Sequence, residues 1–293
     1  MTLDPNAAAR AGAGETAGRP LAIICGAGDF PVALASAAIE AGREPLLIGL
    51  VGSADRRIEA FAHLWLHLGE VGKFLAALRE RGIEEIVVVG AIKRPELTDL
   101  RFDFGALKKL PSLTALFRGG DNNLLTGVAR ILEEEGLKLV GAAEVAPRLV
   151  APDGALTDRT PSAEALADAR LGGALIGALS PFDVGQAAVI ANGRVLAIEA
   201  AEGTDAMLAR VADMRASGRL GLKGRAGVLV KAPKRDQDMR LDMPAVGPLT
   251  IDGARRAELQ GIALAACRVL LIGREACARA AQEAGLFLHG MEL

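Results

Sequence analysis

The chain has 293 residues, of which 51% are hydrophobic and 24% charged, and its formal net charge is −2. This balance excludes the strong basic field that draws proteins to nucleic acid, and 3% aromatic residues leave few side chains to stack on bases. The composition is that of a soluble globular protein, and the length favours two domains. We therefore expect no nucleic-acid partner.

Residues 1–18 are expected to form a flexible tail, because they lack the basic stretch and apolar run of a signal peptide. The three cysteines form no CxxC pair and leave an odd number, which favours a reduced, cytoplasmic compartment. The apolar run LGGALIGALS is too short to span a bilayer. Peripheral contact with a membrane surface stays compatible with this composition.

Strand and helix patterns alternate through residues 19–149, the expected N-terminal domain. Strands are predicted at LAIIC, EPLLIGL, HLWLHL, EEIVVVG and LKLVGA. Helices are predicted at PVALASAAIEAG, SADRRIEAFA, EVGKFLAALRERG, FDFGALKKL and DNNLLTGVARILEEEG. Such alternation with short connections predicts βαβ units and a Rossmann-like parallel sheet covered on both faces.

Residues 150–161 are rich in Pro, Asp, Thr and Gly and are expected to be a linker. Residues 162–293 predict a second, mixed α/β domain, with Ser162 capping its first helix and an antiparallel hairpin around Asn192-Gly193. Further strands are predicted at AGVLVKA, GIALAACRVLLIG and LFLHG, and further helices at GTDAMLARVADMRA, IDGARRAELQ and REACARAAQEAG. The fold class is therefore α/β, with a parallel first sheet and a mixed second one.

A glycine-rich turn joins the first strand to the first helix. Gly26 and Gly28 would let backbone N–H groups approach a phosphate, beside Asp29, at the helix N-terminus. Pro31 stands where a dinucleotide fingerprint has its third glycine, so the pattern is incomplete. The alternative is a tight turn that needs glycine for its backbone angles.

Charged residues also follow later predicted strands and open later helices. Lys93 and Arg94 follow the fourth strand and suit a pyrophosphate, or are solvated surface charges. Asp121 and Asn122 precede a helix, where they would bind ribose hydroxyls or a hydrated cation, or serve as a cap.

Thr204 and Asp205 open a helix after the hairpin. One interpretation is a simple helix cap, and the other is a phosphate contact by Thr204 with a metal-binding carboxylate at Asp205.

A loop of mixed charge follows the strand GVLVK. Its acids Asp238 and Asp242 are candidate catalytic and metal-binding residues, because carboxylate oxygens hold hard divalent cations or orient water. Its candidate substrate-binding residues, whose side chains offer hydrogen-bond donors, are Lys231, Gln237 and Arg240. The prolines of the loop restrict its shape, as a preorganised site requires.

The chain resembles the LpxI type of UDP-2,3-diacylglucosamine pyrophosphatase. The resemblance lies in IICGAGDFPVALA, GGDNNLLTGVARILEEEG, DVGQAAVIANGRVLAIEAAEGTDAML and VLVKAPKRDQDMRLDMPAVGPLTI. It implies two domains that hold the substrate between them, and a homodimer. It also implies Mg²⁺-dependent hydrolysis of UDP-2,3-diacylglucosamine to UMP and 2,3-diacylglucosamine 1-phosphate (lipid X), a step of lipid A biosynthesis, in the cytoplasm or at the cytoplasmic face of the inner membrane.

The resemblance further implies attack by water at the phosphorus on the sugar side and an essential aspartate in the second domain. Asp238 and Asp242 lie in the matching motif, and Asp205 is the reserve. Two other functions remain open from the residues alone. One is a nucleotide-sugar or lipid-binding protein without turnover, and the other is a nicotinamide-dependent oxidoreductase, which the incomplete glycine fingerprint disfavours.

Overall fold

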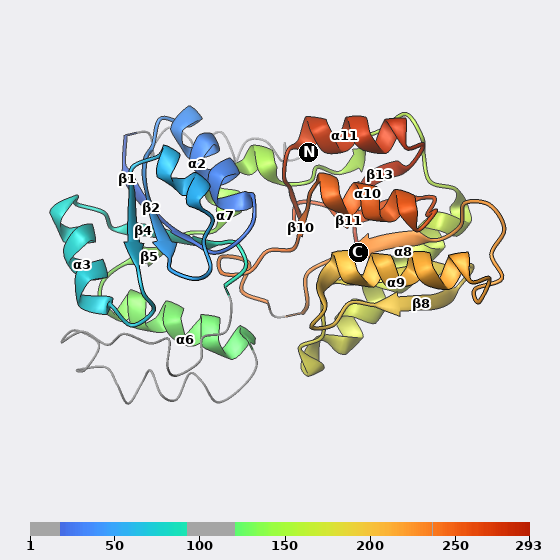
Figure 1. Ribbon diagram of the computed structural model, residues 1–293, viewed down its shortest axis with the longest axis horizontal. Helices are drawn as coiled ribbons and strands as arrows, with labels where there is room; N and C mark the ends of the chain where they lie inside the picture. The colour runs from blue at the N-terminus through green and yellow to red at the C-terminus, as the bar shows by residue number, and fades with distance from the viewer. Residues whose placement is uncertain (1–17, 93–120, 236) are drawn as a thin grey trace, which may run out of the picture. The chain divides into compact units, whose positions relative to one another are not determined.

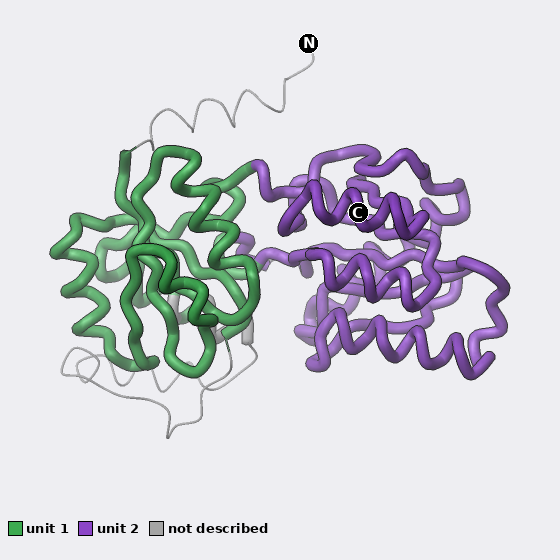
Figure 2. Tube along the Cα trace, turned by 45° about the horizontal axis from the view of Figure 1, so that its top comes forward, with its two compact units in different colours: residues 1–147, 240–242 green, residues 148–239, 243–293 purple. Residues whose placement is uncertain are grey.

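The computed structural model describes residues 18–92, 121–235 and 237–293, and for residues 121–126 and 128 it describes the backbone alone. These residues form two compact units (Figure 2). Unit 1 comprises Met1–Pro147 and Arg240–Asp242, and unit 2 comprises Arg148–Met239 and Met243–Leu293. A short segment from late in the sequence therefore belongs to the first unit.

A parallel sheet forms the centre of unit 1, with the strand order β3-β2-β1-β4-β5 in the described part of the chain. The strands are β1 (Pro20–Cys25), β2 (Glu44–Leu50), β3 (His63–Leu66), β4 (Glu85–Val89) and β5 (Lys138–Leu139). The helices are α2 (Phe30–Glu40), α3 (Val71–Glu80), α6 (Asp121–Glu134) and α7 (Ala142–Val145), with the 3₁₀ turn η1 (Arg56–Ala60). The predicted Rossmann-like arrangement is confirmed.

Helices cover both faces of this sheet (Figure 1). Along β1, Ala22 and Ile24 point to the face covered by α3 and α6, where they share a buried apolar cluster with Phe74 and Leu132. Helix α2 packs on the other face, where it contacts β1 and β2. Burial on both faces explains why the strands are continuous apolar runs instead of alternating ones.

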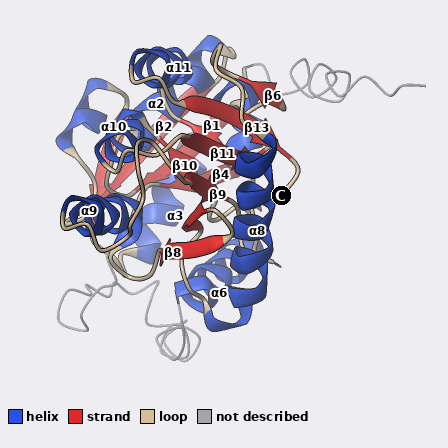
Figure 3. Ribbon diagram, turned by 90° about the vertical axis from the view of Figure 1, so that its right-hand side faces the viewer, coloured by secondary structure: helices blue, strands red, loops and turns tan. Residues whose placement is uncertain are grey.

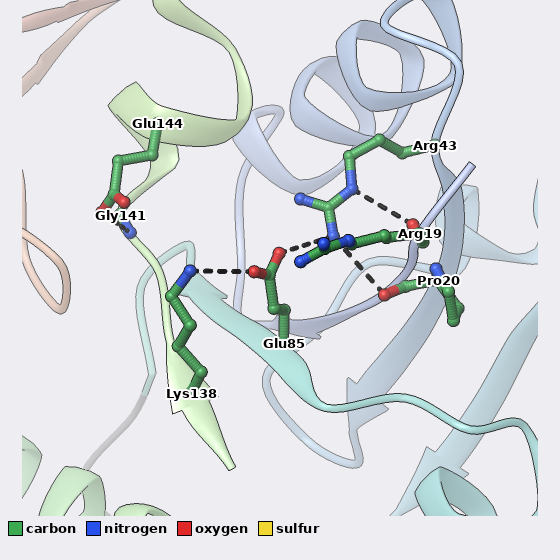
Figure 4. Close-up of polar contacts among 7 residues, drawn as sticks. All are labelled: Arg19, Pro20, Arg43, Glu85, Lys138, Gly141 and Glu144. Carbon is green, nitrogen blue, oxygen red and sulfur yellow. Dashed lines mark hydrogen bonds and ion pairs between the residues drawn. The ribbon is translucent and has the colours of Figure 1, made fainter. Parts of the chain in front are cut away.

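A buried ion pair closes the amino edge of the sheet (Figure 4). Glu85, the first residue of β4, accepts hydrogen bonds from Arg43 Nη2 at 2.8 Å and from Lys138 Nζ at 3.0 Å. Arg43 Nε also donates to the carbonyl of Arg19 at 3.2 Å. Burial alone would raise the pKa of Glu85, but the bonds from Lys138 and Arg43 outweigh it and hold the pKa below its ordinary value of 4.5.

Unit 2 contains a mixed sheet with the strand order β6-β13-β11-β9-β7-β8 among the described residues. Its strands are β6 (Gly154–Ala155), β7 (Ala187–Ala191), β8 (Arg194–Ile198), β9 (Val228–Lys231), β11 (Gly261–Ala265) and β13 (Phe287–Met291). Strands β9, β11 and β13 run parallel, while β7 is antiparallel to both β8 and β9. The predicted mixed α/β fold is confirmed.

Helices cover both faces of this sheet (Figure 3). Helix α8 (Ala163–Leu179) packs against β7 and β9, and Ser162 caps it by accepting a 3.2 Å hydrogen bond from the Ala165 N–H. The opposite face carries α9 (Gly203–Ala216), α10 (Pro248–Arg256) and α11 (Arg274–Glu283). The core between these layers is rich in alanine, valine and leucine.

The hairpin of β7 and β8 turns at Asn192 and Gly193, as the sequence predicts. Both residues have positive φ, 54° and 72°, which suits the right-handed twist of the strands. The buried carboxylate of Asp168 on α8 accepts hydrogen bonds from the N–H groups of Asn192 at 2.9 Å and Gly193 at 2.7 Å. A helix side chain therefore anchors the turn.

Some elements differ from the sequence prediction. The segment SADRRIEAFA forms only the 3₁₀ turn η1, because Ile58 is its one buried residue and β3 begins soon after it. Helix α10 begins at Pro248, earlier than predicted, and Glu258 has a left-handed φ of 50° just beyond its end. Residues 150–161 contain β6, which pairs with β13. Residues 245–246 form β10 (Ala245–Val246), which pairs with β12 (Leu270–Leu271) in a second small sheet.

Within the described ranges, no helix combines the length and the apolar character that crossing a bilayer requires. The predicted helix FDFGALKKL lies outside the described residues.

Candidate active site

Three polar side chains meet at the carboxyl edge of the sheet in unit 2. Lys231 ends β9, Glu199 follows β8, and Thr204 lies in the first turn of α9. Lys231 Nζ donates to Thr204 Oγ1 at 2.6 Å and to Glu199 Oε2 at 3.2 Å, and Thr204 Oγ1 donates to Glu199 Oε1 at 2.8 Å. Lys231 is 4% exposed and Glu199 8%. We call this group the Lys231 cluster.

The strand register brings the members of the cluster together. Lys231 stands opposite Ala187 in the β9–β7 pair, and the Glu199 N–H donates to the Ala187 carbonyl at 2.9 Å. The Gln186 N–H, just before β7, donates to Glu199 Oε2 at 2.9 Å, so the carboxylate is also held by the backbone that leads into β7. A Cβ added at Gly185 would lie 2.4 Å from Glu199 Cγ, so glycine leaves the space that this side chain occupies.

The N-terminus of α9 lies beside the cluster and has no side-chain cap: Glu202 is the N-cap residue, but its side chain does not cap the helix. Thr204 uses its hydroxyl within the Lys231 cluster, which the simple cap interpretation does not predict. Gly203 has φ +80°, and an added Cβ would meet nothing within 4 Å. The first backbone N–H groups of a helix carry partial positive charge, so this edge is suited to an anion. Asp205 lies exposed in the same turn.

The loop after β9 is held to unit 2 at its start. Lys234 donates its N–H to Gln237 Oε1 at 2.9 Å, and its ammonium forms an ion pair with Asp183. The Arg235 N–H donates to Ser180 Oγ at 2.7 Å. Gln237 is 9% exposed, so its side chain supports the loop from inside. Asp238, the next residue, is half-buried and belongs to unit 2.

The next part of the loop belongs to unit 1. Arg240 Nη1 donates to Glu133 Oε1 on α6 at 3.0 Å. Leu241 is 7% exposed and joins the apolar cluster of unit 1. Asp242 is half-buried and also belongs to unit 1, so the candidate acids Asp238 and Asp242 are attached to different units.

The glycine turn of unit 1 is explained in part by packing. The Gly26 N–H donates to the Val89 carbonyl at 2.8 Å, and a Cβ on Gly26 would lie 2.6 Å from the Ala91 carbonyl oxygen. Gly26 therefore allows the loops after β1 and β4 to touch. Gly28 has φ +99° with nothing within 4 Å of an added Cβ, so it lies at an open position. The Asp29 carboxylate forms a 2.6 Å ion pair with Arg57 Nη1.

Several candidate residues lie where the structure gives no side-chain description. Lys93 and Arg94 lie outside the described residues. Helix α6 begins at Asp121, and Asn122 follows it, but only their backbone is described. Among the residues whose side chains the structure describes, no three His, Cys, Asp or Glu gather closely enough to hold a metal ion.

Glu199 was missed by sequence reasoning. A signal for it was present, since it lies near the end of an apolar strand-like run, as Lys231 does. The candidates Lys231 and Thr204 are brought together by the fold, and Glu199 is the residue that links them.

The fold and this site define a two-unit α/β protein with buried charge and an uncapped helix N-terminus at a carboxyl sheet edge, which is where such folds bind phosphorylated ligands. Residues 20–149 match the LpxI N-terminal domain and residues 152–289 the LpxI C-terminal domain. The chain therefore belongs to the LpxI family, which confirms the resemblance seen in its motifs.

A curated relative, the UDP-2,3-diacylglucosamine pyrophosphatase LpxI of Caulobacter vibrioides, is 40% identical over 274 residues, which cover 94% of this chain and 98% of the relative. Among solved structures, the GalE-like L-threonine dehydrogenase of Cupriavidus necator in its holo form matches with 14% identity and a TM-score of 0.27, over 91% of this chain and 94% of that one.

Proposed function

We propose that this protein hydrolyses the pyrophosphate bond of UDP-2,3-diacylglucosamine and releases UMP and 2,3-diacylglucosamine 1-phosphate, a step of lipid A biosynthesis. The observation that carries the proposal is the 40% identity to a relative of that name across 94% of the chain. Family matches over both halves of the chain support it.

The Lys231 cluster supplies donors for a phosphate group. A lysine ammonium has three N–H donors. Within the described residues, Glu199 and Thr204 take two of them, which leaves one for a phosphate oxygen. The N-terminal N–H groups of α9 add to this positive edge. Donors fixed before the reaction stabilise charge on phosphoryl oxygens without reorganising.

The aspartates of the loop are the proposed source of water activation. Asp238 is the first candidate for the general base that orients and deprotonates the attacking water, and Asp242 is the second. Both carboxylates are half-buried. Hydrolysis of a phosphoanhydride depends mainly on positioning and electrostatics, so a carboxylate that orients one water molecule can contribute much of the rate.

The donor set of the loop fits Mg²⁺, because its acids offer oxygen ligands and Mg²⁺ in phosphoryl-transfer sites is usually held by one or two carboxylates together with substrate phosphates. Asp238, Asp242 or Asp205 would provide those carboxylates. Bound there, the cation would neutralise developing charge on the phosphate oxygens. The described residues contain no preformed cluster of three ligands, so the substrate would complete the site.

The acyl chains of the proposed substrate belong to the bilayer. We therefore propose that the protein works in peripheral contact with the inner membrane. We also propose that it is cytoplasmic and forms a homodimer, as its resemblance to the LpxI family implies. Sedimentation with vesicles of bacterial phospholipid tests the first part, and analytical ultracentrifugation tests the second.

The deciding experiment is UMP release from UDP-2,3-diacylglucosamine, measured with Mg²⁺ and with EDTA. The proposal predicts turnover with Mg²⁺, loss with EDTA, and a loss of roughly 10²–10⁴-fold in Asp238→Asn or Asp242→Asn. Circular dichroism of each variant separates loss of chemistry from loss of fold. A folded wild type that binds UDP-2,3-diacylglucosamine without hydrolysing it, across several divalent cations, would instead support a binding protein.

A further inference from the structure

The carboxylate of Glu199 accepts three hydrogen bonds at the carboxyl edge of unit 2. Oε1 accepts from the Thr204 hydroxyl at 2.8 Å, and Oε2 accepts from the Gln186 N–H at 2.9 Å and from Lys231 Nζ at 3.2 Å. The donors come from the residue before β7, the end of β9 and the first turn of α9. The proposed chemistry gives Glu199 no direct contact with the substrate.

A contribution to folding stability does not by itself explain why Glu199 and Lys231 form a buried ion pair. Removing two charges from water is costly, and buried ion pairs can often be replaced by apolar residues without loss of stability. The core beside the cluster is otherwise apolar, with Ala187, Ala188 and Val230 fully buried. A charged pair at this sheet edge therefore calls for a role in the site.

We propose that Glu199 is a positioning residue that acts through Lys231 and Thr204, an inference that rests on the proposed function. Its two carboxylate oxygens hold the ammonium and the hydroxyl in one orientation. That orientation directs the remaining N–H of Lys231 to a phosphate oxygen of the substrate. Glu199 also places a carboxylate 3.2 Å from the Lys231 ammonium, in a pair whose side chains are 11% and 6% exposed.

A double-mutant cycle tests this inference. Glu199→Gln keeps the side-chain shape, and Lys231→Met keeps most of the lysine stem. We expect Glu199→Gln to lower kcat by roughly 10- to 100-fold with KM changed by less than about threefold, because a misplaced donor acts mainly in the transition state. The double variant should turn over no more slowly than Lys231→Met alone, since a residue that acts through Lys231 adds nothing once Lys231 is gone.

Thermal unfolding separates this role from a structural one. Glu199→Gln leaves a buried cation unpaired and should lower Tm, whereas the double variant removes both charges and should recover most of that Tm. A purely structural pair would recover kcat along with Tm. Asp252→Asn is the matched control, because Asp252 likewise forms ion pairs, with Arg255 and Arg256, but its side chain is 45% exposed. It should leave kcat and Tm unchanged.

Two results would overturn the inference: a folded Glu199→Gln with wild-type kcat, or losses that multiply in the double variant. If the wild type releases no UMP, the proposed function fails. The same double-mutant cycle is then measured by the affinity for UDP, from calorimetric titration, instead of by kcat. The positioning role would then be retained if Glu199→Gln, Lys231→Met and the double variant all weaken UDP binding by the same factor. It would be rejected if Glu199→Gln binds UDP as tightly as the wild type.

Discussion

Arg240 donates a 3.0 Å hydrogen bond from Nη1 to Glu133 Oε1, although 107 residues separate the two in sequence. The next residue, Leu241, is 7% exposed within the apolar cluster that also contains Ala129 and Leu132 of α6. The loop that carries Asp238 therefore joins unit 1 at Arg240, two residues after Asp238.

Leu241→Ala should destabilise unit 1. Removing a buried leucine side chain leaves a cavity and typically costs about 2–5 kcal/mol. Urea unfolding followed by circular dichroism measures the change. Leu249→Ala is the control, since Leu249 is 71% exposed and its truncation should have no measurable effect. Equal effects of the two variants would show that Leu241 is not part of the core.

Glu85 should make stability depend on pH. Its pKa is lower in the folded protein than its ordinary value of 4.5, so its contribution is full above that value and is lost as pH falls through the folded pKa. Urea unfolding between about pH 3 and 7 should show that loss in the wild type, and Glu85→Gln should flatten this part of the profile.

Glu85→Gln should also lower the stability at pH 7 by about 3 kcal/mol, because the buried Arg43 loses its charged partner. Glu59→Gln, which breaks a surface pair with Arg56, serves as the control. An unchanged acid profile in Glu85→Gln would mean that other carboxylates dominate the pH dependence.

Asp168→Ala should loosen the hairpin of β7 and β8. The Asn192 and Gly193 N–H groups would lose their carboxylate acceptor, at a cost of about 1.5–3 kcal/mol, the typical contribution of a hydrogen bond to a charged group. Amide hydrogen exchange should show faster exchange at these two residues. Asp213→Ala, an exposed change on α9, should leave both rates as they are. Unaltered exchange in Asp168→Ala would contradict the anchoring role.

The cysteines should differ in reactivity. Burial raises the pKa of Cys25 to about 12 and that of Cys277 to about 11, so both remain thiols at neutral pH, whereas Cys267 is exposed. Because the thiolate is the reactive form, a disulfide reagent at pH 8 should titrate Cys267 alone in the native protein. All three should react in guanidinium chloride. Rapid native labelling in a Cys267→Ser variant would show that the buried thiols open readily.

Hydrolysis in ¹⁸O-labelled water should identify the phosphorus that is attacked. We expect the label in 2,3-diacylglucosamine 1-phosphate, because attack at the sugar-side phosphorus adds the water oxygen to that product and expels UMP. Mass spectrometry of both products measures it. Label in UMP would mean attack at the other phosphorus and a different placement of the base.

Regular elements of this fold follow from local patterns. The turn at Asn192-Gly193 and the Ser162 cap are visible in sequence because turn and cap chemistry acts over a few residues. The Rossmann-like sheet follows from alternating apolar strands and helices. Strands of two residues, such as β6 and β10, are too short to show an alternation of apolar and polar residues. They form because they pair with β13 and β12.

The site was harder to predict because it depends on register. Lys231 and Thr204 were identified as charged or polar residues at element ends, but the cluster exists because Ala187 stands opposite Lys231 and so places Glu199 beside it. No local sequence pattern predicts that Ala187 and Lys231 are paired. In the same way, Gly26 resembles a phosphate-binding glycine in sequence, while its contact with Ala91 depends on how β1 and β4 lie together.

The segment Arg240–Asp242 also matters for protein synthesis. On the ribosome, residues 20–147 emerge first and contain every strand of the sheet in unit 1 within the described chain, but Leu241 is still missing from its core. At ordinary elongation rates this residue is added roughly 5–20 s later. During that interval the apolar surface that Leu241 will cover is open to chaperones, and unit 1 completes its packing only when most of unit 2 has been made.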